Sequence, residues 1–254
     1  MKYKFYSIIQ IFLSLLIKII QNPLRFFSLP KELFIFFCTY IEFKSKFDGA
    51  SSIFFRPIFF QRNLDSKFDA HYVIQAWWAS SRIKKISPPK HIDVSSNVGY
   101  VAQLAAMIPV EFYEFNPPHL ILPGLLIKKA SLDCLPFKDN TIESLSCLHV
   151  LEHIGLGRYG DPIDPDGMTR ACHELSRVIK SGGHLLVSFP IGRERVEFNS
   201  QRITNPSKAL LMFPHFFLKE FSLVNDKRQF IKNADITLAA NERFACGMYH
   251  LIKA

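Results

Sequence analysis

The sequence predicts an α/β fold built on a doubly wound, mostly parallel β-sheet. From residue 91 onward, short apolar segments with strand character alternate with segments of helical periodicity, which is the pattern of a parallel sheet with helices on both faces. Acidic residues end the first two apolar segments, at Asp93 and Glu114. The carboxyl ends of strands are where open α/β sheets bind their ligands. We therefore expect residues 91–254 to form one ligand-binding domain.

The first strand and its turn occupy residues 91–99, with the sequence HIDVSSNVG. A helical pattern of apolar residues follows, so this stretch predicts a strand-turn-helix unit. The small residues Ser95, Asn97 and Gly99 let the backbone approach a ligand, and Asp93 can accept hydrogen bonds from it. The strongest form of such a turn carries glycine at all three of these positions, and here only Gly99 is present. A turn that only connects two core elements is the alternative interpretation.

The second and third strands are expected at residues 110–114 and 125–130. Glu114 lies about twenty residues beyond Asp93, where a doubly wound fold places a carboxylate that accepts hydrogen bonds from ribose hydroxyls. After the third strand, Asp133 can accept a hydrogen bond from an adenine amino group while Cys134 packs on the ring. These positions favour a nucleoside ligand.

The fourth strand is expected at residues 142–148, and the polar residues His149, Glu152 and His153 follow it. A loop rich in glycine and proline then spans residues 155–167 and is longer than a simple connection requires. Loops of this kind shape substrate pockets, and its expected contacts are Arg158, Tyr159 and Asp161. Prolines separate the acidic residues of the loop, and no closing glutamate follows at calcium-loop spacing, so we assign no metal ligand here.

The remaining elements complete the sheet. A helix over residues 168–179 is expected to stop at the Gly-Gly turn of residues 180–183, before a fifth strand at 184–189. A polar insert (192–206), a helix (209–217) and two late strands (221–224 and 244–252) follow. We expect the two late strands to pair antiparallel.

The N-terminal part of the chain differs in composition from the rest. We divide it into an apolar, basic helical segment (1–45) and an irregular or helical lead-in (46–90). Two apolar runs, residues 5–20 and 33–43, are expected to form helices that lie on a membrane surface or pack on the protein. A true transmembrane anchor is the alternative, but the first run is interrupted by polar residues and the second is too short to span alone.

Charge and cysteine content restrict the partners and the compartment. The formal net charge is +9, which suggests an acidic partner. Because the basic residues near the N-terminus lie among apolar ones and the others are dispersed, we expect a membrane surface, contacted through residues 1–43, and no nucleic acid. The five cysteines have no paired spacing, which favours reduced thiols. The expected location is cytoplasmic, peripheral on the inner face of the membrane.

These features together resemble the class I S-adenosylmethionine-dependent methyltransferases of the type 11 group. The resemblance rests on Asp93, Glu114 and three segments, residues 132–140 (LDCLPFKDN), 148–153 (LHVLEH) and 180–187 (KSGGHLLV). It covers about residues 67–254. It implies a seven-stranded sheet with a late antiparallel hairpin and S-adenosylmethionine held over Asp93, Gly99, Glu114 and Asp133.

A narrower similarity is to the bacterial family known as domain of unknown function 268. It is carried by residues 68–72 (FDAHY), 75–77 (QAW), 91–93 (HID) and 155–162 (GLGRYGDP). This similarity does not supply a substrate.

For methyl transfer, the enzyme mainly has to position a nucleophile and exclude water, and a base helps when the acceptor is a hydroxyl. His149 and His153 are the candidates, since their spacing can place both on one side of a helical turn. Glu152 can orient one of them or join in a metal site. The alternative for Glu152 and His153 is that they serve only as a cap at the helix start and a packing partner. We expect O-methylation of a saccharide or small hydroxylated metabolite. The other hypothesis is a catalytically inactive methyltransferase-like module that acts as a scaffold at a membrane-associated glycan or lipid assembly complex.

Overall fold

The structure is a computed structural model that describes residues 15–47, 57–60 and 68–254. The chain divides into two compact units, an N-terminal unit (residues 1–67) and a C-terminal unit (residues 68–254). The start of the first apolar run and most of the residues 48–67 of the lead-in lie outside the described residues.

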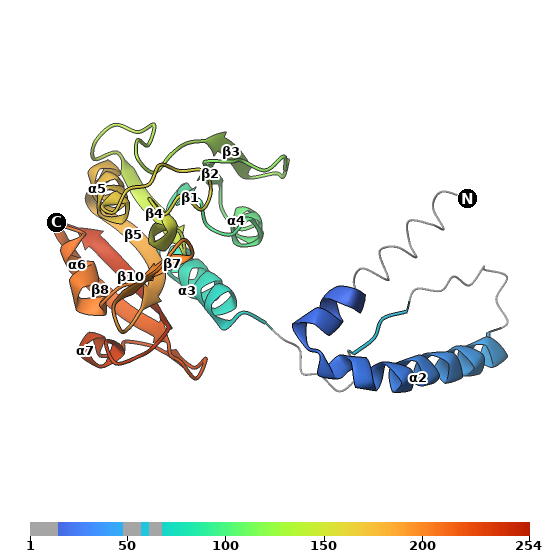
Figure 1. The fold of residues 1–254 in the computed structure, drawn as a ribbon. Helices are drawn as coiled ribbons and strands as arrows, with labels where there is room; N and C mark the ends of the chain where they lie inside the picture. Colours follow the sequence, from blue (N-terminus) through green and yellow to red (C-terminus); the bar gives the residue numbers. More distant parts are fainter. Residues whose placement is uncertain (1–14, 48–56, 61–67) are drawn as a thin grey trace. The chain divides into compact units, whose positions relative to one another are not determined.

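The C-terminal unit is organised around one large sheet with the strand order β3-β2-β1-β4-β5-β10-β8-β9 (Figure 1). Its strands are β1 (His91–Val94), β2 (Val110–Glu114), β3 (Leu125–Lys129), β4 (Ile142–Leu148), β5 (Ile179–Ile191), β8 (Phe216–Val224), β9 (Phe230–Ile231) and β10 (Ala245–Lys253). Strands β1 to β5 are parallel, and β10 pairs antiparallel with both β5 and β8. The doubly wound, mostly parallel sheet and the late antiparallel pair are thus confirmed.

The sheet has eight strands rather than the expected seven. The additional strand is β9, whose two residues pair with the end of β8. A separate hairpin of β6 (Arg195–Glu197) and β7 (Gln201–Ile203) lies in the segment that we described as a polar insert. All three strands are too short for side-chain periodicity to reveal them.

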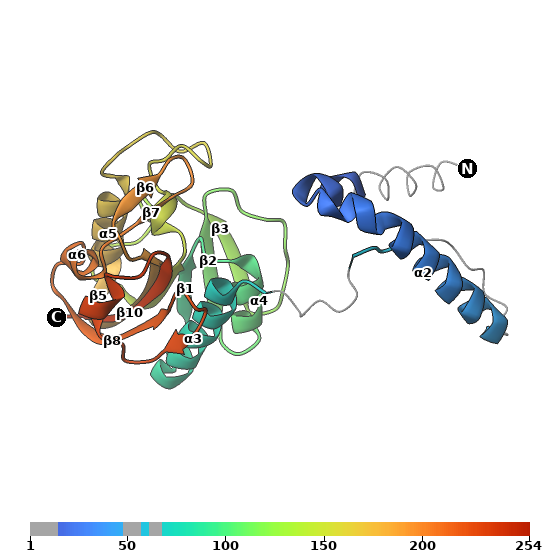
Figure 2. The ribbon, with the colours of Figure 1, turned by 60° about the horizontal axis from the view of Figure 1, so that its bottom comes forward.

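Helices cover both faces of the sheet, which produces three layers (Figure 2). On one face, α3 (Ala70–Ile86) and α4 (Val98–Ala105) bury Trp78 and Leu104. On the other face, α5 (Gly167–Val178), α6 (Pro206–Leu211) and α7 (Ile236–Ala239) bury Leu175 and Ala209. Burial of each large aliphatic or aromatic side chain stabilises the fold by roughly 1.5–3 kcal/mol. The two cores therefore fix the sheet and leave its carboxyl edge to carry the polar side chains.

Two expected boundaries were wrong. Strand β5 begins at Ile179, not after the Gly-Gly turn, because Ile179 already pairs with Ile142 of β4. The segment expected as a helix over residues 209–217 divides between α6 and β8, because Asn205 caps α6 early and residues 216–218 pair with β10. Continuous apolar runs do not distinguish a buried helix from a buried strand, so tertiary pairing decides.

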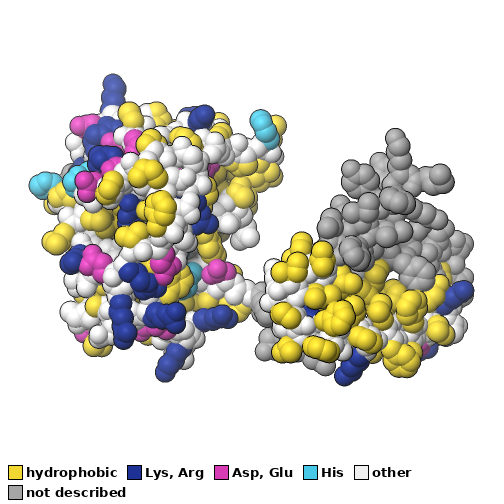
Figure 3. Space-filling view, in the orientation of Figure 1, with side chains coloured by type: hydrophobic (Ala, Val, Ile, Leu, Met, Phe, Trp, Pro, Cys, Tyr) yellow, Lys and Arg dark blue, Asp and Glu magenta, His cyan; other side chains and the backbone are white. Residues whose placement is uncertain are grey.

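In the N-terminal unit, residues 15–21 are helical and α2 spans Leu24–Lys46. The second expected helix is thus part of a longer one that continues through Pro30, since an internal proline removes one backbone donor without ending every helix. None of the residues of α2 is buried, and Figure 3 shows apolar side chains over much of its surface. Among the described residues, no helix is long and apolar enough to cross a membrane.

Candidate functional site

The candidate site begins where β1 and β4 lie side by side at the centre of the sheet, with Asp93 opposite Ser146. Strand order reverses at this point, and doubly wound folds bind ligands at such a switch. Just beyond the two strands, Ser95 and His149 have φ angles of 56° and 55°. Positive φ is uncommon outside glycine, and it turns both backbones away from the sheet at its carboxyl edge.

Asp93 supports this turn from below. Its side chain is fully buried, accepts a hydrogen bond from the Ser96 N–H at 3.1 Å and accepts another from the Ser146 hydroxyl. Ser146 also contacts Nε2 of the buried His91 at 2.8 Å. Burial raises the pKa of Asp93 to about 7 and lowers that of His91 to about 3. Asp93, expected to bind a cofactor, therefore holds the turn and β4 together and lines neither of the two cavities at this edge of the sheet.

The smaller cavity, of about 370 Å³, lies over the carboxyl ends of the parallel strands. Four expected residues from successive strand ends line it: Ser95 after β1, Glu114 at the end of β2, Asp133 after β3 and His149 after β4. Most of the remaining wall is apolar, with Phe115, Ala130, Leu132, Val150 and Ile154. A mostly apolar cavity with a few convergent polar groups is typical of a small-molecule site.

The two carboxylates of this cavity are held differently. Glu114 accepts hydrogen bonds through Oε1 from the N–H groups of Phe115 at 2.7 Å and Asn116 at 3.3 Å. Asp133 is exposed and accepts a hydrogen bond from the Ser131 hydroxyl at 3.1 Å. Local hydrogen bonds thus orient both carboxylates beside the cavity.

The structure does not bring Gly99 or Cys134 to the smaller cavity. The Gly99 N–H donates to Oδ1 of Asn97 at 2.8 Å, so Asn97 caps α4 with its own side chain. Gly99 lines a third cavity, of about 550 Å³, with Asn97 and Tyr72. Cys134 is exposed. Asparagine thus provides the cap at a position where the sequence pattern leads one to expect glycine.

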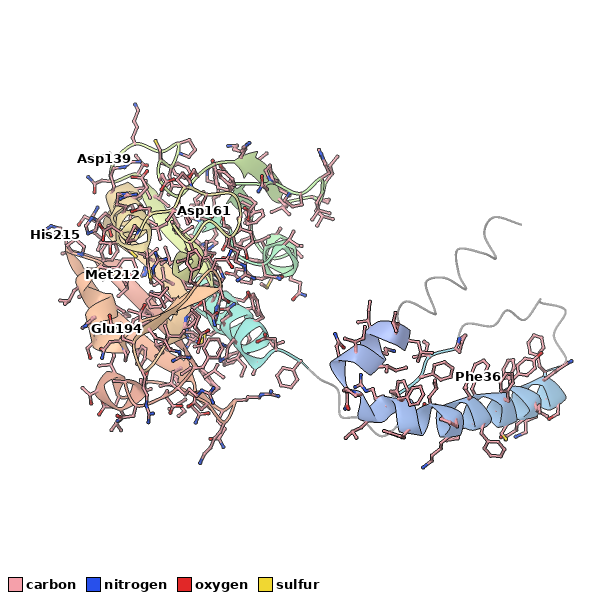
Figure 4. The ribbon with its side chains drawn as sticks, viewed as in Figure 1. Phe36, Asp139, Asp161, Glu194, Met212 and His215 are labelled. Carbon is pink, nitrogen blue, oxygen red and sulfur yellow. The ribbon has the colours of Figure 1, made fainter. Side chains whose placement is uncertain are left out.

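The larger cavity, of about 1090 Å³, adjoins the same strand ends. His149, Glu152 and His153, all expected as catalytic residues, line it together with Arg158 of the long loop. Tyr159 and Asp161 of the same loop line the smaller cavity instead; Figure 4 shows Asp161 in this loop. His149 and His153 line both cavities, so they form part of the wall between them.

Residues that sequence reasoning missed complete the larger cavity. They come from the β6–β7 hairpin and from the segments around β8 and β10, and they are Arg195, Glu197, Ser200, Gln201, Asn225, Asp226, Arg228, Arg243 and Phe244. Both acids have partners nearby in the structure. Glu197 forms an ion pair with Arg195 at 2.8 Å, and the Asp226 carboxylate accepts hydrogen bonds from the backbone N–H groups of Arg243 and Phe244. The guanidinium groups of Arg228 and Arg243 are exposed to the cavity.

Glu152 lies between the two histidines. It is fully buried in the 3₁₀ turn η1 (Leu151–His153), and its Oε1 is 2.7 Å from Nδ1 of His149 and 3.7 Å from Nε2 of His153. Nδ1 of His153 donates to the Ser200 carbonyl at 2.7 Å. Within the described part of the chain, Nε2 of His149 and Oε2 of Glu152 are buried without a hydrogen-bond partner. The two histidines thus flank one carboxylate, although His149 precedes η1 with a φ angle of 55° and does not share a helical turn with His153.

The surroundings of the three histidines give them different pKa values, so they differ in charge at neutral pH. Burial disfavours the charged form of His149, but the Glu152 carboxylate and the Cys246 sulfur raise its pKa to about 10. Burial lowers the pKa of His153 and lowers that of His71 to about 4. At neutral pH, His153 is therefore an uncharged imidazole whose proton is on Nδ1, which leaves the lone pair on Nε2.

Helix α3 covers His149. Asp69 caps the helix by accepting the N–H groups of His71 and Tyr72 at 3.0 and 3.3 Å. The rings of both residues stack near His149, with centroids 5.5 and 5.3 Å away. Further along the helix Trp78 is fully buried and serves the core. The first turn of α3 thus belongs to the site and its middle to the core.

A family model described as "Caenorhabditis protein of unknown function, DUF268" matches residues 138–251. This match confirms the similarity to that family, although its description names Caenorhabditis where we expected a bacterial family. No curated protein matches the sequence.

Several solved structures are similar to this chain. The YcgJ protein of Bacillus subtilis superposes with a TM-score of 0.52 and 11% identity over 71% of this chain and 98% of its own. The [4+2]-cyclase SpnF has a TM-score of 0.49 and 13% identity over 70% and 81%. A putative methyltransferase of Bacillus halodurans C-125 has 0.47 and 14% over 68% and 98%. At such identities the likeness to YcgJ establishes a common fold.

Proposed function

We propose that this protein is an S-adenosylmethionine-dependent methyltransferase that methylates a hydroxyl of a saccharide or of another small hydroxylated metabolite. The observation that carries the proposal is the position of His149 and His153 in the wall between the two cavities. A nucleoside-sized group in one cavity and an acceptor in the other would meet beside these imidazoles. Placing two reactants side by side is the main requirement of an in-line displacement.

The smaller cavity fits the cofactor. Its volume of about 370 Å³ and its apolar wall suit an adenosine group. Glu114 would hold the ribose hydroxyls, Asp133 the adenine amino group, and Ser95 the part nearest the β1 turn. When bound, S-adenosylmethionine supplies an electrophilic methyl group on its sulfonium.

The residues of the chain then account for proton removal from the acceptor. His153 is held by the Ser200 carbonyl so that Nε2 can accept the hydroxyl proton. Glu152, with Oε1 3.7 Å from that nitrogen, stabilises the imidazolium that forms. Arg158 donates to the same carbonyl at 3.1 Å and keeps this arrangement in place.

The larger cavity favours a polar acceptor. Its size exceeds that of the cofactor cavity, and polar side chains from several elements line it. Arg228 and Arg243 offer guanidinium donors, which bind hydroxyl, carboxylate or phosphate oxygens. A hydroxylated compound, with or without an acidic group, matches this lining.

Calorimetric titration of the full chain with S-adenosylmethionine and S-adenosylhomocysteine tests the cofactor. We expect micromolar binding that Glu114→Ala and Asp133→Ala each weaken at least tenfold. Glu143→Ala is the matched control, since Glu143 pairs with Lys180 on the surface, away from both cavities. Absence of binding by a folded protein would contradict the proposal and favour an inactive scaffold module.

Transfer of a labelled methyl group to a panel of saccharides tests the base. His153→Ala is expected to lower kcat by about 10²-fold or more, as loss of a general base does. His173→Ala, an exposed histidine of α5, is the control. Equal kcat values for His153→Ala and the wild type would exclude His153 as the base.

We further propose that α2 contacts a membrane surface. Its exposed residues include Leu24, Phe26, Phe27, Phe34 and Ile41, and lysines occupy its last turn. Apolar side chains with flanking basic groups are typical of interfacial helices. Co-sedimentation of the full chain with phosphatidylglycerol vesicles should fall at least fivefold in a Phe27→Ser/Phe34→Ser variant. Unchanged co-sedimentation, relative to a Leu211→Ser control, would contradict the assignment.

A further inference from the structure

Three side chains from distant parts of the sequence meet beside the wall between the two cavities. His71 comes from the first turn of α3, His149 follows β4, and Cys246 lies on β10. One ligand atom of each, a ring nitrogen or the thiol sulfur, lies within 4.8 Å of the other two. We propose that these three residues bind a divalent transition-metal ion of the zinc type.

The donor set selects the class of metal. Two imidazole nitrogens and one thiolate suit Zn²⁺ or Co²⁺, whereas Mg²⁺ and Ca²⁺ prefer oxygen ligands. Bonds of about 2.0–2.3 Å at tetrahedral angles would place the donor atoms about 3.3–3.6 Å apart. The observed limit of 4.8 Å therefore requires a movement of about 1 Å or slightly more. His71 can supply this movement, because it is only partly buried at the helix start.

The hydrogen bonds of His149 match those of a metal ligand. Its Nδ1 is 2.7 Å from the buried Glu152 carboxylate, while its Nε2 is buried and has no hydrogen-bond partner in the described residues. Metal-bound histidines typically donate the other ring N–H to a carboxylate in this way. A buried nitrogen without a partner is unfavourable, and a metal ion would satisfy it.

Cys246 completes the set from the core side. Its thiol is fully buried and donates a weak hydrogen bond to Oε1 of Gln75, 3.9 Å from the sulfur. Metal binding would form the metal–sulfur and metal–nitrogen bonds and release two protons to solvent, one from the thiol and one from Nε2 of the His149 imidazolium. Because His71 and His149 stack with ring planes inclined by 25°, coordination would also rotate His71 out of this stack.

Three protein ligands leave one coordination position open, as in catalytic zinc sites. His71 and His149 line the larger cavity, so the open position would face it. A hydroxyl bound there would lose its proton more readily. This role rests on the proposed methyl transfer, while metal binding itself does not.

The test uses the full-length protein freed of metal with a chelator. Titration with Zn²⁺ should show one equivalent bound, and Co²⁺ should produce a thiolate-to-cobalt charge-transfer band. Cys246→Ser should abolish that band, and His71→Ala should weaken binding at least tenfold. Cys134→Ser and His119→Ala, which alter residues outside the cluster, should change neither.

Glu152→Gln provides a second measurement. Glu152 is a positioning residue for His149, so Glu152→Gln should shift the cobalt d–d bands and lower the affinity for the metal ion by about 10-fold or more. No stoichiometric binding by the folded wild type, or a charge-transfer band retained in Cys246→Ser, would overturn the metal site. S-adenosylmethionine binding by the metal-free protein is measured separately, so failure of the metal site and failure of the proposed methyltransferase function are distinguishable.

Discussion

Glu220 of β8 binds two side chains of α3 through an ion pair and hydrogen bonds. Its replacement by alanine should strongly destabilise the C-terminal unit. The carboxylate accepts hydrogen bonds from Nη2 and Nε of Arg82 and, at 3.0 Å, from Nε1 of Trp78. The side chains of Arg82 and Glu220 are only 7% and 15% exposed. Glu220→Ala would therefore leave a buried cation without its counter-ion.

The expected cost follows from this burial. Removing one partner of a buried ion pair costs about 3–5 kcal/mol. One kcal/mol corresponds to about 2–4 °C in Tm for 150–250 residues, so the melting temperature should fall by roughly 6–20 °C. Replacing Arg82 with methionine as well removes the unpaired charge. The double variant should then lose only about 1–3 kcal/mol, the cost of the unpaired Trp78 N–H.

Urea and thermal unfolding, followed by circular dichroism and tryptophan fluorescence, measure the stability of the wild type, Glu220→Ala, the double variant and a control variant. Glu194→Ala is the matched control, because the Glu194–Lys208 pair is 52% and 62% exposed and such pairs contribute about 0–1 kcal/mol. A loss of stability for Glu220→Ala no larger than that for Glu194→Ala would contradict the stabilising role of the buried Glu220 carboxylate. A double variant less stable than Glu220→Ala alone would contradict the cost assigned to the unpaired Arg82 charge.

Three further predictions concern the fold around the site. Burial raises the pKa of Asp93 from 3.8 to about 7, so the Asp93 carboxyl loses its proton at lower pH in the unfolded chain than in the folded one. The free energy of unfolding should therefore fall by up to about 4 kcal/mol as the pH rises from about 4 to 7. Urea unfolding of Asp93→Asn across this range should lack that slope. Gly155 has φ +79°, and an added Cβ would lie 2.0 Å from the Asp164 carbonyl, so Gly155→Ala should displace the long loop and speed its cleavage in limited proteolysis, whereas an unchanged rate would argue against this. Leu175→Ala in the core should lower the free energy of unfolding by about 2–5 kcal/mol and the exposed Leu211→Ala by less than about 0.5 kcal/mol, and similar values in denaturant titrations would contradict the assigned core.

The sequence predicts the parallel half of the sheet well because local patterns determine it. Strands β2 and β4 have the expected bounds, and β3 ends within one residue of them. Each is a short apolar segment bounded by turn residues. The C-terminal half is predicted less accurately because long-range pairing with β10 decides where β8 begins.

The candidate site divides in the same way. Ser95, Glu114, Asp133 and His149 follow directly from their places at strand ends, and all four line the smaller cavity. The contribution of Cys246 depends on the register of a distant antiparallel strand, and that of His71 on how α3 docks. No local window of sequence contains either fact. For the same reason, local sequence does not predict that Arg228 and Arg243 line the larger cavity.

The central position of β10 also affects how the chain folds. β10 lies between β5 and β8, although it follows both in sequence. The parallel strands can assemble through local crossovers, but β5 keeps an unpaired edge until β10 pairs with it, because residues 192–244 separate the two strands in sequence. An exposed strand edge is a template for pairing with another chain. The edge of β5 is therefore where incompletely folded molecules would first associate.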